Sequence, residues 1–150
     1  MSEIQEDELL KVEKVDAFIS PSTPHVPVIT LQLENGEQFI LYYVPYEIVL
    51  SINRLEENHS DSSRESLFDI LPHFTSFIDE LDKSLVRVII NELNPETMLY
   101  TAIAEFNINN LIIHRRMIPS HAIYLAMLAN KPIYVDRDLV RHQATLRNNV

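Results

Sequence analysis

The chain has 150 residues and contains no cysteine. Disulfide bonds, thiolate zinc sites and a cysteine nucleophile are therefore excluded, whatever the fold. A bound metal ion would need oxygen or imidazole ligands. Gly36 is the only glycine in the sequence, so a glycine-rich phosphate loop and a G-x-S-x-G nucleophile elbow are also missing. These absences argue against a nucleotide-fold enzyme.

Long apolar runs are missing too. No run reaches the roughly 20 apolar residues that a membrane-spanning helix needs. The acidic opening, residues 1–16, has neither the basic nor the apolar part of a signal peptide. The sequence therefore predicts no membrane association and a cytoplasmic location.

The composition that remains is that of a globular protein, with 46% hydrophobic and 23% charged residues. A chain of this length is typical of one domain and can bury an apolar core. We therefore predict a single domain over residues 1–150, with its folded core over about residues 10–140.

The net charge of −10 is unevenly distributed along the chain. Residues 1–105 hold six Lys or Arg against twenty Asp or Glu, whereas residues 106–150 hold six against two. The basic residues of the second part are Arg115, Arg116, Lys131, Arg137, Arg141 and Arg147. They indicate a face that binds an anion such as RNA or DNA, or else a solvated surface or a subunit contact that faces the acidic part.

The first half of the chain predicts three strands and then helices. Residues 10–19, 28–33 and 39–44 are apolar and rich in β-branched side chains, and Asn35-Gly36 predicts a type I′ hairpin turn. A helix follows Pro45, because apolar residues then recur every three or four positions. A second helix covers residues 67–81, with a break or kink at Pro72. Ser62 and Glu65 form a possible capping box before it.

The second half predicts three more strands, over residues 85–93, 98–108 and 111–117. An apolar, buried helix follows from Ser120 to Ala129, then a short strand over residues 133–135 and a last helix to about Arg147. The predicted fold class is therefore α+β: two three-stranded antiparallel meanders form a mixed sheet that is packed by helices.

Five stretches of the sequence resemble the bifunctional nuclease domain family. The most specific are Ile118–Ala126 (IPSHAIYLA) and Lys131–Val135 (KPIYV), which match the family's arginine-proline-serine-aspartate-alanine-isoleucine motif and the strand after it. Tyr43–Glu47, Asp69–Leu71 and Val88–Leu93 follow the family pattern in the same order. The resemblance implies a nuclease that acts on RNA and DNA phosphodiester bonds, and an oligomer.

Several polar positions of that motif are replaced. The family's arginine is Ile118 here and its aspartate is His121, while another typical acid aligns with Arg116. The histidine that precedes the aspartate in the second helix is Phe68, whereas Asp69 is kept. The replacements remove acids that a metal ion would use, so a catalytically inactive binding or regulatory module with the same fold is the alternative function.

Two catalytic arrangements are compatible with the residues that remain. In the first, Glu47, Asp69 and Glu92 hold a divalent cation such as magnesium or manganese, which activates water. In the second, which needs no metal, His114 and His121 act as general base and acid while Arg116 neutralises the transition state. The basic and motif residues expected to contact the substrate are His114, Arg115, Arg116 and Ser120.

The apolar strands with little glycine predict self-association as well. Exposed sheet surface is commonly covered in small symmetric oligomers. We expect a homodimer.

Overall fold

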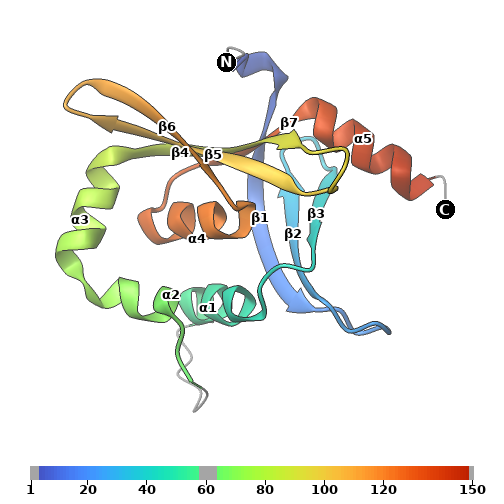
Figure 1. Ribbon diagram of the computed structural model, residues 1–150, viewed down its shortest axis with the longest axis horizontal. Coiled ribbons are helices and arrows are strands. Elements are labelled where there is room, and N and C mark those ends of the chain that lie inside the picture. The colour runs from blue at the N-terminus through green and yellow to red at the C-terminus, as the bar shows by residue number, and fades with distance from the viewer. Residues whose placement is uncertain (1–3, 58–63, 149–150) are drawn as a thin grey trace.

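The computed structural model describes residues 4–57 and 64–148 and shows an α+β fold (Figure 1). The strands of the described residues are β1 (Leu9–Ile19), β2 (Pro27–Leu33), β3 (Gln38–Tyr42), β4 (Leu85–Leu93), β5 (Tyr100–Ile108), β6 (Leu111–Met117) and β7 (Ile133–Asp136). Their α-helices are α1 (Tyr46–Glu57), α2 (Leu67–Ile70), α3 (Thr75–Ser84), α4 (Pro119–Ala129) and α5 (Arg137–Asn148). None of these helices has the length and apolar character needed to span a membrane. The predicted fold class is confirmed.

The strands form one mixed sheet in the order β3-β2-β1-β7-β4-β5-β6. Within each half, strands that follow one another along the chain pair antiparallel. Strand β7 lies between the halves, antiparallel to β1 and parallel to β4. A short strand from near the C-terminus therefore joins two halves of the sheet that are far apart in the sequence.

Helix α4 is enclosed by the rest of the fold. It packs against β4 and β5 on one side and against α1 and α3 on the other (Figure 1). The side chains of Ala122, Ile123, Tyr124 and Ala126 are fully buried. A helix that is apolar on all sides has to be covered on all sides, and the prediction that this helix is buried is confirmed.

Helix α5 covers the outer edge of β3. The Gln143 side chain accepts a hydrogen bond from the backbone N–H of Ile40 at 2.7 Å and donates one to the Ile40 carbonyl at 2.8 Å. Arg147 donates to the Gln38 carbonyl two residues away, at 3.1 Å. An edge strand otherwise presents unpaired backbone groups. The other edge of the sheet, β6, receives no further strand from the described residues.

The hairpin between β2 and β3 forms as predicted, but its turn is not type I′. A type I′ turn needs positive φ at both central residues, and of the Asn35-Gly36 pair only Gly36 has it, at 89°. The Leu33 N–H donates to the Glu37 carbonyl, so the three residues between them form the loop. Within this loop the Gly36 N–H donates to the Leu33 carbonyl. Positive φ at both positions occurs instead at Asn109 (53°) and Asn110 (66°), between β5 and β6.

The helical region after residue 64 breaks at proline, as predicted. Helix α2 ends at Ile70, a 3-10 turn covers Leu71–His73, and α3 begins at Thr75. Pro72 has no N–H to continue a helix. Ser62 of the predicted capping box lies outside the described residues, and the structure places a capping box at Ser66 and Asp69.

Candidate functional site

The residues predicted for the site lie on two different faces of the sheet. Side chains alternate between faces along a strand. On β6, Met117 packs on the core beside α4, so Arg115 shares that face whereas His114 and Arg116 point to the other one. The Ser120 and His121 positions belong to α4 itself. His114 and Arg116 are therefore separated by the sheet from His121, and the structure does not bring together the three residues of the metal-free arrangement.

His114 and Arg116, which lie on the face of the sheet away from α4, each contact an acidic side chain. Arg116 contacts Glu92 across β5 at 2.6 Å. His114 Nε2 lies 3.1 Å from the Glu105 carboxylate, which also contacts Arg87 at 3.3 Å. Two of the predicted site residues, Glu92 and Arg116, thus meet each other in an ion pair that is largely exposed.

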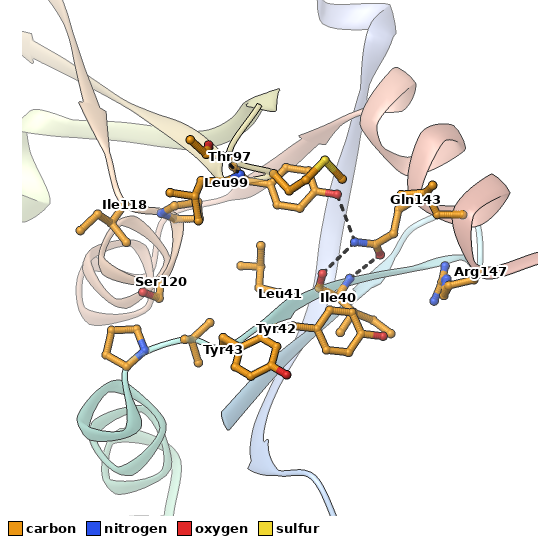
Figure 2. A pocket seen from close by; sticks show the side chains of 16 residues that line it. Ile40, Leu41, Tyr42, Tyr43, Thr97, Leu99, Ile118, Ser120, Gln143 and Arg147 are labelled. Atoms are coloured by element: carbon orange, nitrogen blue, oxygen red, sulfur yellow. Dashed lines mark hydrogen bonds between the residues drawn. The ribbon is translucent and has the colours of Figure 1, made fainter. Parts of the chain in front are cut away.

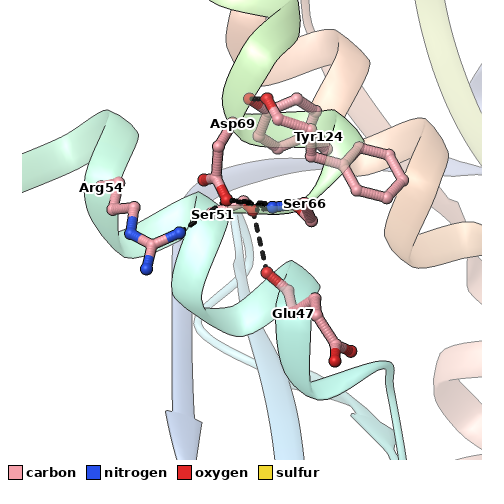
Figure 3. Close-up of polar contacts among 7 residues, drawn as sticks. Glu47, Ser51, Arg54, Ser66, Asp69 and Tyr124 are labelled. Carbon is pink, nitrogen blue, oxygen red and sulfur yellow. Dashed lines mark hydrogen bonds and ion pairs between the residues drawn. The ribbon is translucent and has the colours of Figure 1, made fainter. Parts of the chain in front are cut away.

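Asp69 lies on the helix side in a network that links α2 to α1 (Figure 3). Its Oδ2 accepts hydrogen bonds from Arg54 at 2.6 Å and from the Ser66 backbone N–H at 2.8 Å. The Ser66 hydroxyl lies 3.2 Å from that of Ser51. Burial raises the pKa of Asp69, but the hydrogen bonds from Ser66, Arg54 and Ser51 outweigh it, so the pKa lies below its ordinary value of 3.8.

Glu47 lies near this network but does not enter it through its carboxylate. Its backbone carbonyl accepts a hydrogen bond from Ser51 at 2.9 Å. Its side chain is about half exposed and is 3.8 Å from Arg64. Glu47, Asp69 and Glu92 therefore do not converge, and over residues 4–57 and 64–148 no group of three acids or histidines is placed to hold a metal ion.

His121 packs against Phe68, the residue that stands where the family motif has a histidine. The two rings meet edge to face with centroids 4.8 Å apart, and Tyr124 contacts the same phenyl ring from the next turn of α4, at 5.2 Å. The Tyr124 hydroxyl donates to the Phe68 carbonyl. Burial lowers the pKa of His121, and burial with the Asp69 charge raises the pKa of Tyr124 to about 12. His121 thus helps to hold α2 on α4 through its contact with the Phe68 ring.

Most of the basic residues after residue 105 contact groups of the same chain. Besides Arg116, these are Lys131 with Asp82, Arg137 with the Asp7 carbonyl, Arg141 with Asp138 and Arg147 with the Gln38 carbonyl. Of these partners, Glu92 and Asp82 are acids of residues 1–105, Asp138 belongs to the basic segment itself, and the other two are backbone carbonyls. Exposed pairs of this kind are weak, so they do not prevent contact with an external anion.

A feature that the sequence analysis missed is an apolar cavity of about 750 Å³. The sheet curls so that β5 begins beside β3, where Phe39 and Tyr100 meet with ring centroids 4.9 Å apart. Next to this contact, the end of β3, the β4–β5 loop, the start of α4 and helix α5 surround an open space (Figure 2). Its lining residues are Ile40, Leu41, Tyr42, Tyr43, Val44, Pro45, Thr97, Met98, Leu99, Tyr100, Ile118, Pro119, Ser120, Gln143, Leu146 and Arg147.

Two walls of the cavity have unusual backbone conformations. Tyr43 and Met98 have φ of 56° and 60°, a region that non-glycine residues rarely adopt and that costs about 1–2 kcal/mol. Asn94 fixes the loop that holds Met98, since its side chain accepts hydrogen bonds from the N–H groups of Glu96 and Thr97. Strained residues that the surrounding structure maintains are common at ligand sites.

The polar groups of the cavity are few, and they differ in their partners. The Gln143 amide is engaged with Ile40 at both of its ends. Ser120, which the motif had singled out, is 2% exposed, and its buried hydroxyl has no hydrogen-bond partner among residues 4–57 and 64–148. Sequence reasoning identified Ser120 as a candidate, but it could not identify the lining, because the lining comes from four separate stretches of the chain.

No protein-family model matches the chain, and no curated protein matches it. The resemblance to the bifunctional nuclease family therefore stays a prediction that rests on the motif residues.

Proposed function

We propose that this protein is a binding module, and that the cavity between β3, the β4–β5 loop, α4 and α5 holds a small molecule. The observation that carries the proposal is the largely apolar cavity of about 750 Å³, with the polar side chains of Thr97, Gln143 and Arg147 in its lining. Small-molecule sites are mostly apolar concavities of about 300–1,000 Å³ with a few placed polar groups. This cavity agrees with that description in volume, lining and polarity.

The nuclease function that the resemblance implies has less support. Metal-assisted cleavage uses carboxylates that converge on one or two cations. Asp69 is engaged with Arg54 and Ser66, and Glu92 is engaged with Arg116. His114 and His121, the two imidazoles of the metal-free arrangement, lie on opposite faces of the sheet. The alternative function, a catalytically inactive module, is therefore the better-supported one.

The cavity proposal is tested with two leucines of equal exposure. Leu99 lies in the cavity wall and Leu67 lies on α2, and both side chains are 67% exposed. We expect Leu99→Trp to fill part of the cavity and to weaken binding of apolar fragments at least tenfold in ligand-observed NMR, whereas Leu67→Trp changes nothing. Equal binding of the fragments to both variants would show that the cavity is not the site. No binding to the unmodified protein or to either variant would also contradict the cavity proposal.

The same preparation tests the nuclease function. Labelled single-stranded RNA and DNA are incubated with the protein in magnesium, manganese or EDTA, beside Glu47→Ala and His121→Ala. We expect no cleavage above the background of a mock purification. Cleavage that either variant abolishes would overturn the proposed function, and its dependence on EDTA would separate the metal arrangement from the imidazole one.

We further propose that the module assembles into a homodimer through the β5–β6 hairpin. Three large apolar side chains at the end of this hairpin are exposed: Ile108 by 43%, Leu111 by 66% and Ile112 by 57%. They lie beside the β6 edge, which can pair with the same strand of a second copy. The hairpin extends from the body of the fold (Figure 1).

A charge at the hairpin end is expected to separate the dimer. Leu111→Lys should shift the molar mass measured by light scattering from dimer to monomer at micromolar concentration, since two lysines would meet across the two-fold axis. Leu67→Lys is the matched control, because Leu67 is equally exposed on α2, and it should remain a dimer. A monomer for the unmodified protein at every concentration would contradict this proposal and leave the cavity proposal intact.

A further inference from the structure

The charges around the cavity favour an uncharged ligand. None of the 16 lining residues is acidic, so a cation would have no partner there. The basic lining residue is Arg147, which already donates to the Gln38 carbonyl at 3.1 Å, and the net charge of the chain is −10. A charge that enters an apolar site without a partner is costly, so the lining disfavours ions of either sign.

The Gln143 amide determines how one polar group of the cavity, the Tyr100 hydroxyl, can bond. Gln143 Oε1 accepts from the Ile40 N–H at 2.7 Å, and its Nε2 donates to the Ile40 carbonyl at 2.8 Å (Figure 2). These two bonds can form in only one orientation of the amide, because the backbone N–H needs an acceptor and the carbonyl needs a donor. The atom that lies 3.4 Å from the Tyr100 hydroxyl oxygen is therefore Nε2, a donor, and the hydroxyl oxygen is the acceptor in this contact.

The Tyr100 hydroxyl consequently keeps its own hydrogen for another acceptor. A phenolic hydroxyl both accepts and donates, and residues 4–57 and 64–148 supply a donor to it, Gln143, but no acceptor. The Tyr100 ring is partly buried and meets Phe39 edge to face with centroids 4.9 Å apart. Since Tyr100 also belongs to the lining, its hydroxyl is a donor held in place at the cavity wall.

From these observations, and on the basis of the proposed function, we infer that the cavity binds an uncharged apolar molecule with a carbonyl group, whose oxygen accepts a hydrogen bond from Tyr100. A ketone or ester oxygen accepts without donating, so it satisfies the hydroxyl and brings no donor that would need a partner of its own. The apolar body of the ligand lies along Leu41, Val44 and Leu99 of the same lining.

Tyr42 provides the contrast within the same cavity. It also belongs to the lining, but it is 53% exposed, and no side chain of the described residues positions its hydroxyl. Water competes for such a group, whereas a hydrogen bond in a less exposed place is stronger. The two tyrosines therefore form a matched pair for substitution by phenylalanine.

The test uses three ligands of nearly the same shape. Benzylacetone carries the carbonyl group, isopentylbenzene has a methyl group in place of its oxygen, and hydrocinnamate has a carboxylate oxygen in place of its terminal methyl group. Each is titrated below its solubility limit, and Kd is measured by ligand-observed NMR. We expect benzylacetone to bind at least tenfold more tightly than hydrocinnamate, and Leu99→Trp to weaken benzylacetone and isopentylbenzene alike.

The Tyr100→Phe variant isolates the hydrogen bond. It should weaken benzylacetone about threefold to tenfold and leave isopentylbenzene unchanged, while Tyr42→Phe leaves both unchanged. The infrared carbonyl stretch of bound benzylacetone should lie at a higher frequency in Tyr100→Phe than in the unmodified protein, because the hydrogen bond that weakens the carbonyl bond is lost. The melting temperature should stay close to that of the unmodified protein, since Gln143 keeps both of its bonds to Ile40.

The possible results separate the carbonyl inference from the cavity proposal. If Tyr100→Phe weakens both neutral ligands equally or weakens neither, or if hydrocinnamate binds as tightly as benzylacetone, the carbonyl inference is wrong and the binding cavity stands. If none of the three ligands binds the unmodified protein, or if Leu99→Trp has no effect on their binding, the cavity proposal is wrong as well.

Discussion

Replacing Ile123 by alanine is expected to lower the free energy of unfolding by about 2–5 kcal/mol. Ile123 is fully buried on α4, which is itself enclosed by the sheet and by α1 and α3. Removing most of its side chain leaves a cavity that the surrounding elements cannot close without moving. The loss is measured by guanidinium unfolding followed by circular dichroism.

Leu125 on the same helix is the comparison for this prediction. It is an apolar side chain of the same size, but it is only partly buried against the core. Leu125→Ala should therefore cost less, about 1–2 kcal/mol, because part of the side chain is already in water. Equal losses at the two positions, or a loss below about 1 kcal/mol at Ile123, would contradict the enclosed position of α4.

The sequence predicted the elements of this fold well because each has a strong local signal. The strand over residues 85–93 and the one over residues 111–117 have the bounds predicted from their β-branched residues. The break at Pro72 follows from its missing N–H. The position of β7 between the two halves of the sheet has no local signal, since it depends on pairing with residues 45 positions away in β4 and more than 120 positions away in β1.

The turn between β2 and β3 shows a limit of reasoning from residue pairs. Asn-Gly is the strongest short signal for a type I′ turn, yet the register of the hairpin decides which residues become central. With Leu33 bonded to Glu37, three residues rather than two connect the strands. Asn109 and Asn110 carry a weaker signal, but the direct pairing of Ile108 with Leu111 makes both of them central.

The candidate site was predictable only in part. The motif pointed to Ser120 and His121, and both lie at the start of α4. The faces on which His114, Arg115 and Arg116 lie follow from the register of β6, which the sequence does not determine in advance. Tyr43 and Met98 are residue types that seldom adopt positive φ, so nothing in the sequence marked the cavity walls.

Replacing Asp69 by asparagine is expected to lower the free energy of unfolding by about 2–3 kcal/mol at pH 7. The change keeps the size of the side chain but removes the charge that receives hydrogen bonds from Arg54 and from the Ser66 backbone. Urea unfolding measures the loss. Asp79→Asn is the control, because Asp79 lies exposed on α3, and it should change stability by less than about 0.5 kcal/mol.

The pH dependence of this loss follows from the lowered pKa of Asp69. A carboxyl group with a pKa below its ordinary value of 3.8 in the folded protein binds a proton less readily there than in the unfolded chain. Its contribution is fully present above that ordinary value and disappears as the pH falls through the folded pKa. The difference between the unmodified protein and Asp69→Asn should therefore be constant from pH 5 to pH 7 and shrink below about pH 4. A difference that stays the same at pH 3 would show that the loss in Asp69→Asn does not come from the charge of Asp69.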